Sequence, residues 1–92
     1  METNSVTLVC KSIADPKNSR LEIQKLLQNK NIATNGLKSY VDSEDIFFNW
    51  SSLLEFQSGF TDIRKILASK NCNEPKIQLE SGPEITLPPL PE

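Results

Sequence analysis

Residues that form turns and end helices divide this 92-residue chain into short segments, and this division limits the folds open to it. The breaks are Asp15-Pro16, Asn35-Gly36, Ser58-Gly59, residues 71–75 and Ser81-Gly82-Pro83, all of them combinations that favour turns. Each segment between two breaks is long enough for one helix, one strand, or one of each. A chain of this length forms a single domain. We expect that domain to cover residues 1–87, with a proline-rich extended tail at residues 88–92.

The segment after Asp15-Pro16 carries a helical pattern of apolar residues. Ile23, Leu26 and Leu27 fall on one helix face, whereas lysine, arginine and glutamine residues fall on the other. Asp is a common capping residue, and Pro suits the first helical position. The pattern predicts a helix over residues 16–30, with Leu21 as an apolar residue on its polar face.

Two further helices are predicted in the middle of the chain. Ser43, followed by two acidic residues, is typical of a helix N-terminus, and an apolar face follows it at Ile46, Phe47, Trp50, Leu53 and Leu54. These features predict a helix over residues 43–56. A third helix, capped by Ser58 or Thr61, is predicted over residues 60–70. The expected core draws on all three helices and contains Ile23, Leu27, Trp50, Leu54, Ile63 and Leu67.

The remaining segments favour strands. Residues 6–13 are rich in β-branched and apolar types, which predicts an N-terminal strand. Residues 31–42 fit three structures: a hairpin turning at Asn35-Gly36, a helical turn capped by Thr34, or a strand at 37–41 that completes a β-α-β unit. We favour the last. Alternation within residues 77–87 predicts a short C-terminal hairpin, or else an extended C-terminus.

Together these elements define an α+β domain with an N-terminal strand, three helices, a short strand at residues 37–41 and a C-terminal hairpin or extended proline-rich tail. The alternative is a mostly α-helical bundle with extended termini. In either case the core is small, because a domain of this length buries only roughly 60–65% of the surface that its unfolded chain exposes.

The residue types needed for most catalytic and metal sites are scarce. The chain has no histidine, which removes Ser-His and Cys-His pairs and most zinc sites. Its three glycines are isolated, so neither a phosphate loop nor a dinucleotide fingerprint is present. Asp42, Glu44 and Asp45 lack the ligand spacing of a calcium loop, and we interpret them as a helix N-terminus. We therefore expect no enzymatic activity, no cofactor and no metal.

The sequence also predicts where the chain resides. No apolar run approaches the ~20 residues that span a bilayer, and the N-terminus lacks the order of charged and apolar residues of a signal peptide. We expect a cytoplasmic protein without membrane contact. Cys10 and Cys72 are then expected to be reduced thiols, and the sequon Asn49-Trp50-Ser51 to be unused.

Two groups of residues are candidates for binding a partner. Phe48 and Phe56 fall off the main apolar face of the predicted helix at 43–56, and Leu21 falls on the polar face of the first helix. Aromatic anchors commonly carry the binding energy of an interface. The second group is Pro88, Pro89, Leu90 and Pro91, whose proline spacing matches the ligands of WW and SH3 grooves.

The resulting hypothesis is a non-enzymatic protein–protein interaction or regulatory module, such as an adaptor, subunit or inhibitor. Its partner is another protein chain, with a homodimer as one form. The alternative is a small nucleic-acid-associated regulator that uses the basic face of the helix at 16–30. Nucleic acid is the less favoured partner, because the net charge is −2 and no aromatic residue is interleaved with the basic ones.

Overall fold

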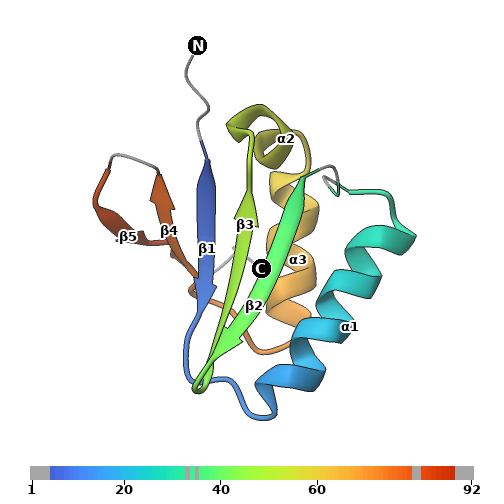
Figure 1. Cartoon of the computed structure of the whole chain (residues 1–92), viewed down its shortest axis with the longest axis vertical. Helices are drawn as coiled ribbons and strands as arrows, with labels where there is room; N and C mark the ends of the chain where they lie inside the picture. Colours follow the sequence, from blue (N-terminus) through green and yellow to red (C-terminus); the bar gives the residue numbers. More distant parts are fainter. Residues whose placement is uncertain (1–4, 33, 35, 80–81, 89–92) are drawn as a thin grey trace.

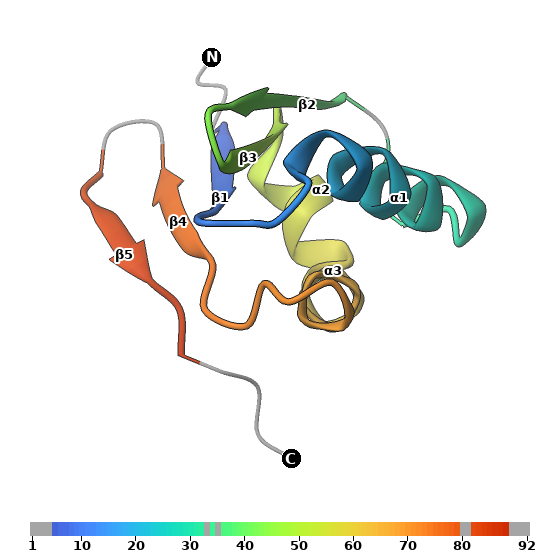
Figure 2. The same ribbon diagram turned by 90° about the horizontal axis from the view of Figure 1, so that it is seen from below.

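The computed structural model describes residues 5–32, 34, 36–79 and 82–88. In this part of the chain, five strands form one antiparallel sheet and three helices pack on one side of it (Figures 1 and 2). This is the α+β class predicted from the sequence, rather than the helical bundle considered as its alternative.

The elements follow the order β1 (Val6–Cys10), α1 (Pro16–Asn29), β2 (Leu37–Asp42), β3 (Asp45–Trp50), α2 (Leu53–Ser58), α3 (Phe60–Ser69), β4 (Lys76–Leu79) and β5 (Glu84–Thr86). In the sheet the strand order is β2-β3-β1-β4-β5, and every neighbouring pair is antiparallel. β1 and β2 are therefore parallel to each other, with β3 between them. The predicted β-α-β unit is present in this split form, and the strand predicted at 37–41 is confirmed as β2.

The helix predicted over residues 43–56 is wrong, because residues 45–50 form β3. Ile46, Phe48 and Trp50 are buried, whereas the residues between them are partly exposed. This alternation has the two-residue period of a strand. Aromatic and β-branched side chains also suit a pleated surface, and β3 is paired on both sides, by β1 and by β2.

The turn between β2 and β3 consists of Ser43 and Glu44, which separate the paired residues Asp42 and Asp45. Ser43 has a φ of 59°, in the left-handed region that tight hairpin turns use. The residue expected to cap a helix thus reverses the chain.

Helix α2 is all that remains of the helix predicted at 43–56. It begins after Ser52, whose Oγ accepts a hydrogen bond from the Glu55 backbone N–H at 3.4 Å. A serine hydroxyl in this position satisfies one of the unpaired N–H groups of the first turn. The helix N-terminus is therefore nine residues later than the sequence pattern suggested.

The helices predicted over 16–30 and 60–70 are confirmed as α1 and α3. Their predicted caps are not. Asp15 has a φ of 50°, and α3 follows Gly59; within the described residues neither position supplies a side-chain capping hydrogen bond. Pro16, by contrast, occupies the first turn of α1 as expected.

The core lies between the sheet and the helices. The expected core residues that are buried are Ile23, Leu27, Trp50, Ile63 and Leu67. Leu54, however, is 78% exposed, so its predicted burial is wrong. In α2 it is Phe56 that points inward, where its ring lies 5.1 Å from that of Trp50. The inward face of this short helix was misassigned because it was predicted as part of a longer one.

Cys10 and Cys72 form a disulfide bond, with their Cα atoms 5.7 Å apart. Cys10 ends β1, and Cys72 follows α3. Both are buried, and the packing of α3 beneath the sheet brings them together. This corrects the expectation of two reduced thiols, which rested on the expected cytoplasmic location rather than on any local sequence signal.

The C-terminal hairpin is confirmed by β4 and β5. After β5, the Leu87 N–H donates a hydrogen bond to the Pro75 carbonyl at 2.9 Å, and the Arg64 guanidinium donates one to the Pro88 carbonyl. Arg64 is buried and lies over the ring of Phe60. The chain is thus attached to the domain as far as Pro88, and residues 89–92 of the predicted tail lie outside the described residues.

Candidate functional site

The aromatic pair predicted as a contact surface lies in the core. Phe48 is 0% exposed and Phe56 is 2% exposed. Phe48 is an inward-facing residue of β3, and its ring centroid lies 6.4 Å from that of Trp50. Phe56 packs between Trp50 and Phe60. The hypothesis that these two rings meet another chain is therefore corrected: in the folded domain they stabilise the core.

The other predicted contact residues have different positions. Leu21 is 57% exposed on α1, and its role in binding stays a prediction. Pro88 is exposed, but Arg64 holds its carbonyl. Pro89, Leu90 and Pro91 lie outside the described residues. Of the residues named from the sequence, Leu21 is the one that the structure places on an accessible helix surface.

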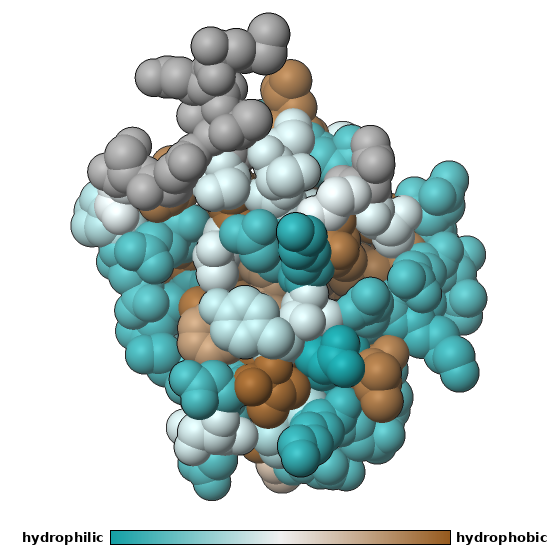
Figure 3. Space-filling view, in the orientation of Figure 1, coloured by the Kyte–Doolittle hydropathy of each residue, from teal (hydrophilic) through white to brown (hydrophobic). Residues whose placement is uncertain are grey.

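The sheet face opposite the helices carries a stacked aromatic pair, Tyr40 of β2 and Phe47 of β3. Their ring centroids are 4.8 Å apart, and the two residues are directly paired in the sheet. Figure 3 shows this side of the molecule as mostly polar, with apolar groups in separate places. Cross-strand aromatic pairs of this kind stabilise a sheet by themselves, so the pair needs no ligand to explain it.

The acidic residues Asp42, Glu44 and Asp45 lie at the β2–β3 turn rather than at a helix N-terminus. Asp45 Oδ1 accepts a hydrogen bond from the Ser12 N–H at 3.1 Å, and the Glu44 carbonyl accepts one from the Ile13 N–H at 2.9 Å. Glu44 and Asp45 thus attach the turn to the β1–α1 connection. Within the described residues, no group of His, Cys, Asp and Glu side chains is arranged to hold a metal ion.

None of the helices that the structure describes is both long and apolar enough to cross a bilayer.

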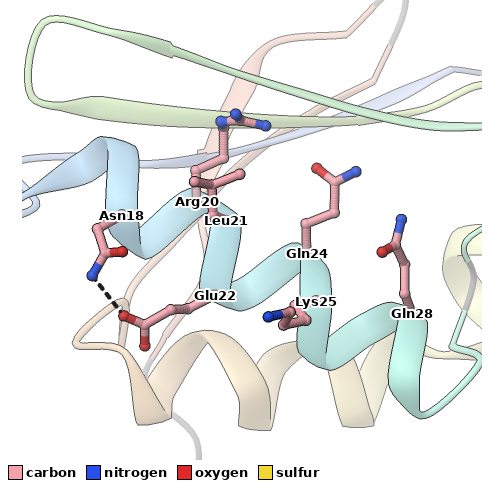
Figure 4. A pocket seen from close by; sticks show the side chains of 7 residues that line it. All are labelled: Asn18, Arg20, Leu21, Glu22, Gln24, Lys25 and Gln28. Atoms are coloured by element: carbon pink, nitrogen blue, oxygen red, sulfur yellow. Dashed lines mark hydrogen bonds between the residues drawn. The ribbon is translucent and has the colours of Figure 1, made fainter.

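A hollow of about 430 Å³ runs along α1, lined by side chains between residues 18 and 28. Figure 4 shows Arg20, Gln24 and Gln28 pointing from the helix toward the neighbouring strands, whereas Glu22 and Lys25 lie away from them. Arg20, Gln24 and Gln28 follow one another at intervals of four residues, which places them in one row along the helix. We call these three residues the polar row.

The strand that the polar row contacts is β2, which ends the sheet. It pairs with β3 on one side, and in the described part of the chain no strand pairs with its other side. Such an edge presents unpaired backbone N–H and C=O groups that can bond to another chain. α1 lies beside β2 and runs in the opposite direction (Figure 1). The open edge and the polar row are therefore neighbouring surfaces.

Ser39 of β2 connects these two surfaces. Arg20 Nη1 donates a hydrogen bond to Ser39 Oγ at 3.0 Å, and the same hydroxyl donates one to Gln24 Oε1. The bonds fix the distance between α1 and β2. A guanidinium carries five N–H donors in a planar fork, so Arg20 retains the capacity to bind a further acceptor.

Glu22, the acidic residue of the hollow, forms an ion pair with a lysine at the end of α3. Lys70, which follows α3, donates a hydrogen bond to Glu22 Oε2 at 2.5 Å. This hydrogen bond and then the positive charge of Lys70 lower the pKa of the Glu22 carboxyl. The pair links α1 to the end of α3, and it leaves Arg20 and Lys25 as the positive groups of the hollow.

Two sequence patterns point to this site, and neither is sufficient to identify it. The alternation of Lys38, Tyr40 and Asp42 with less polar residues is typical of a half-buried strand, and the four-residue spacing of the polar row is visible in the helix. The edge position of β2, however, follows from the strand order, and that order depends on β3, which was predicted as a helix.

Comparison of the chain with protein-family models, with curated protein sequences and with solved structures finds no match. The class of the protein is therefore defined by the fold and the site alone. It is a small α+β domain with a split β-α-β unit, in which a helix borders an open strand edge.

Proposed function

We propose that this chain is a non-enzymatic protein-interaction module that binds an extended segment of another protein along the open edge of β2, beside α1. The observation that supports this proposal is the unpaired edge of β2 next to the row of α1 side chains that points toward the strands. In strand addition, backbone hydrogen bonds provide affinity, and side-chain contacts provide specificity. An adaptor, subunit or inhibitor is able to work in this way.

The β2 edge is better suited to such binding than the β5 edge. β2 is six residues long, whereas β5 is three residues long, and very short edge strands are one way in which proteins prevent pairing with another chain. β2 also contains no proline, so each of its residues retains its backbone N–H. An added segment at β2 would contact both the strand and the side chains of α1.

The cytoplasmic location expected from the sequence stays a prediction, and the disulfide bond favours a different one. Cytosolic thiols are kept reduced, whereas disulfide bonds persist in oxidising compartments. We propose that the chain acts in an oxidising environment, and that its partner segment is present there. Mass spectrometry of the protein from its natural source, with alkylation before reduction, distinguishes the two locations.

Peptide selection followed by a matched pair of tryptophan variants tests the proposed function. Random nine-residue peptides on phage are selected against the folded protein, and enriched peptides are measured by fluorescence anisotropy. Gln28→Trp places a bulky ring in the hollow, and Gln57→Trp places the same ring on the exposed surface of α2. We expect Gln28→Trp to weaken binding about tenfold or more, equivalent to about 1.4 kcal/mol, and Gln57→Trp to have little effect.

Equal binding by the two variants would show that the peptides bind elsewhere and would refute this site. The nucleic-acid alternative has its own readout. Labelled single- and double-stranded DNA and RNA that bind the protein with a steep dependence on salt concentration would favour it, since phosphate contacts weaken as salt rises.

A further inference from the structure

The spacing of the polar row matches the spacing of side chains on a strand. An α-helix rises 1.5 Å per residue, so Arg20, Gln24 and Gln28 follow one another at about 6 Å. Same-face side chains of a strand follow one another at about 6.6 Å, because the rise is about 3.3 Å per residue and alternate residues share a face. An extended segment beside β2 would therefore direct every second side chain toward one member of the polar row.

The members of the polar row differ in charge. Different positions of a bound segment would therefore face chemically different groups. Arg20 is cationic, while Gln24 and Gln28 are neutral amides that both donate and accept hydrogen bonds. Glu22 points away from the strands (Figure 4) and is paired with Lys70, so it does not neutralise Arg20. The end of the polar row at Arg20 is thus suited to an anion and the rest of the row to polar side chains.

We propose that the segment bound beside β2 is an acidic extended peptide, with an aspartate or glutamate facing Arg20 and with amide or hydroxyl side chains two and four residues along it facing Gln24 and Gln28. This inference rests on the proposed function, and it adds the chemistry of the partner. A guanidinium binds a carboxylate through two parallel N–H···O bonds, and its hydrogen bond to Ser39 holds Arg20 in place for that contact.

A glutamate scan tests this proposal. The probes are fluorescein-labelled nine-residue peptides of alternating threonine and glutamine, each with a single glutamate that is moved through all nine positions. The affinity should vary with a period of two residues, because only one face of an added strand meets α1. The best glutamate position should bind about threefold to tenfold more tightly than the peptide without glutamate, as expected for a partly exposed charged hydrogen bond.

Two variants, each of which removes one positive charge, show where the preference for glutamate arises. Arg20→Gln should abolish the preference for glutamate, so that this variant binds the glutamate peptide and the neutral peptide equally well. Lys65→Gln removes the same charge from the exposed surface of α3, outside the hollow along α1, and it should preserve the preference.

The failures of the two proposals are distinguishable. If the neutral and the glutamate peptides bind equally well, or if the preference persists in Arg20→Gln, the acidic partner is refuted while binding at the β2 edge stands. If the preference disappears in Lys65→Gln instead, the anion site lies outside the polar row and the inference is also refuted. If no peptide of the scan or the phage selection binds, both proposals fall.

Discussion

Two positions of α2 show how strongly the contribution of a residue depends on its orientation. Leu54 and Phe56 are both large and apolar, yet Leu54 is 78% exposed and Phe56 is 2% exposed. The Phe56 ring contacts those of Trp50 and Phe60. Removing a ring from such a site loses the transfer free energy and leaves a cavity, whereas truncating an exposed side chain does neither.

Alanine substitutions of Leu54 and Phe56 should therefore differ widely in their effect on the free energy of unfolding. We expect Phe56→Ala to destabilise the domain by about 3–5 kcal/mol and Leu54→Ala to change its stability by less than about 0.5 kcal/mol. Urea unfolding followed by tryptophan fluorescence measures both. Because a small domain has little stability to lose, Phe56→Leu serves as a milder second variant. A destabilisation by Leu54→Ala equal to that by Phe56→Ala would show that α2 faces the other way.

At the scale of the elements, the helices α1 and α3 were predictable because each carries local information sufficient to define it. Pro16 marks the start of α1, and the spacing of Ile23 and Leu27 identifies its buried face. β3 was not predictable in this way. Ile46, Phe47 and Trp50 fit a helical period as well as Ile46, Phe48 and Trp50 fit a strand period, and the choice between the two is made by pairing with β1 and β2.

The candidate site was missed for the same reason. The polar row belongs to a helix that was correctly predicted, and Leu37 to Asp42 were correctly assigned to a strand. Whether that strand has an open edge depends on long-range pairing between residues of β1, β2 and β3, which no local pattern contains. The disulfide bond likewise joins residues that only the packed fold brings together.

The connection that leads into β2 requires a glycine at position 36, and this requirement can be tested. Gly36 has a φ of +79°, and a Cβ atom at this position would collide with Ser51 Oγ. Gly36→Ala should lower the free energy of unfolding by more than about 1 kcal/mol, since alanine is disfavoured at positive φ. Gly82→Ala is the matched control, because its φ is not positive and its Cβ would meet only Leu79 at 3.7 Å. Equal melting temperatures for the two variants would contradict this account of the turn.

At the scale of the whole molecule, the Cys10–Cys72 disulfide bond connects the first strand to the segment after the last helix. It joins residues 62 positions apart, and in the chain-entropy description closing a loop of this length stabilises the folded state by about 4 kcal/mol. For a domain of this size that is a large share of its total stability. The oxidation state of the molecule should therefore decide whether it is folded under mild denaturing conditions.

The double variant Cys10→Ala/Cys72→Ala tests this contribution. We expect it to unfold at a much lower urea concentration than the oxidised parent, with a loss of about 4 kcal/mol, and to be insensitive to a phosphine reductant that destabilises the parent. Two titratable thiols in the unfolded, unreduced parent would contradict the disulfide bond.

The central claim is that the open edge of β2, beside α1, binds an extended segment of another chain. Hydrogen–deuterium exchange of the domain, with and without a saturating peptide from the phage selection, tests it most directly. A segment that pairs with β2 bonds to N–H groups of Leu37–Asp42 that otherwise face solvent, so the exchange of these amides should slow. Protection confined to β4 and β5, with β2 unchanged, would contradict the claim.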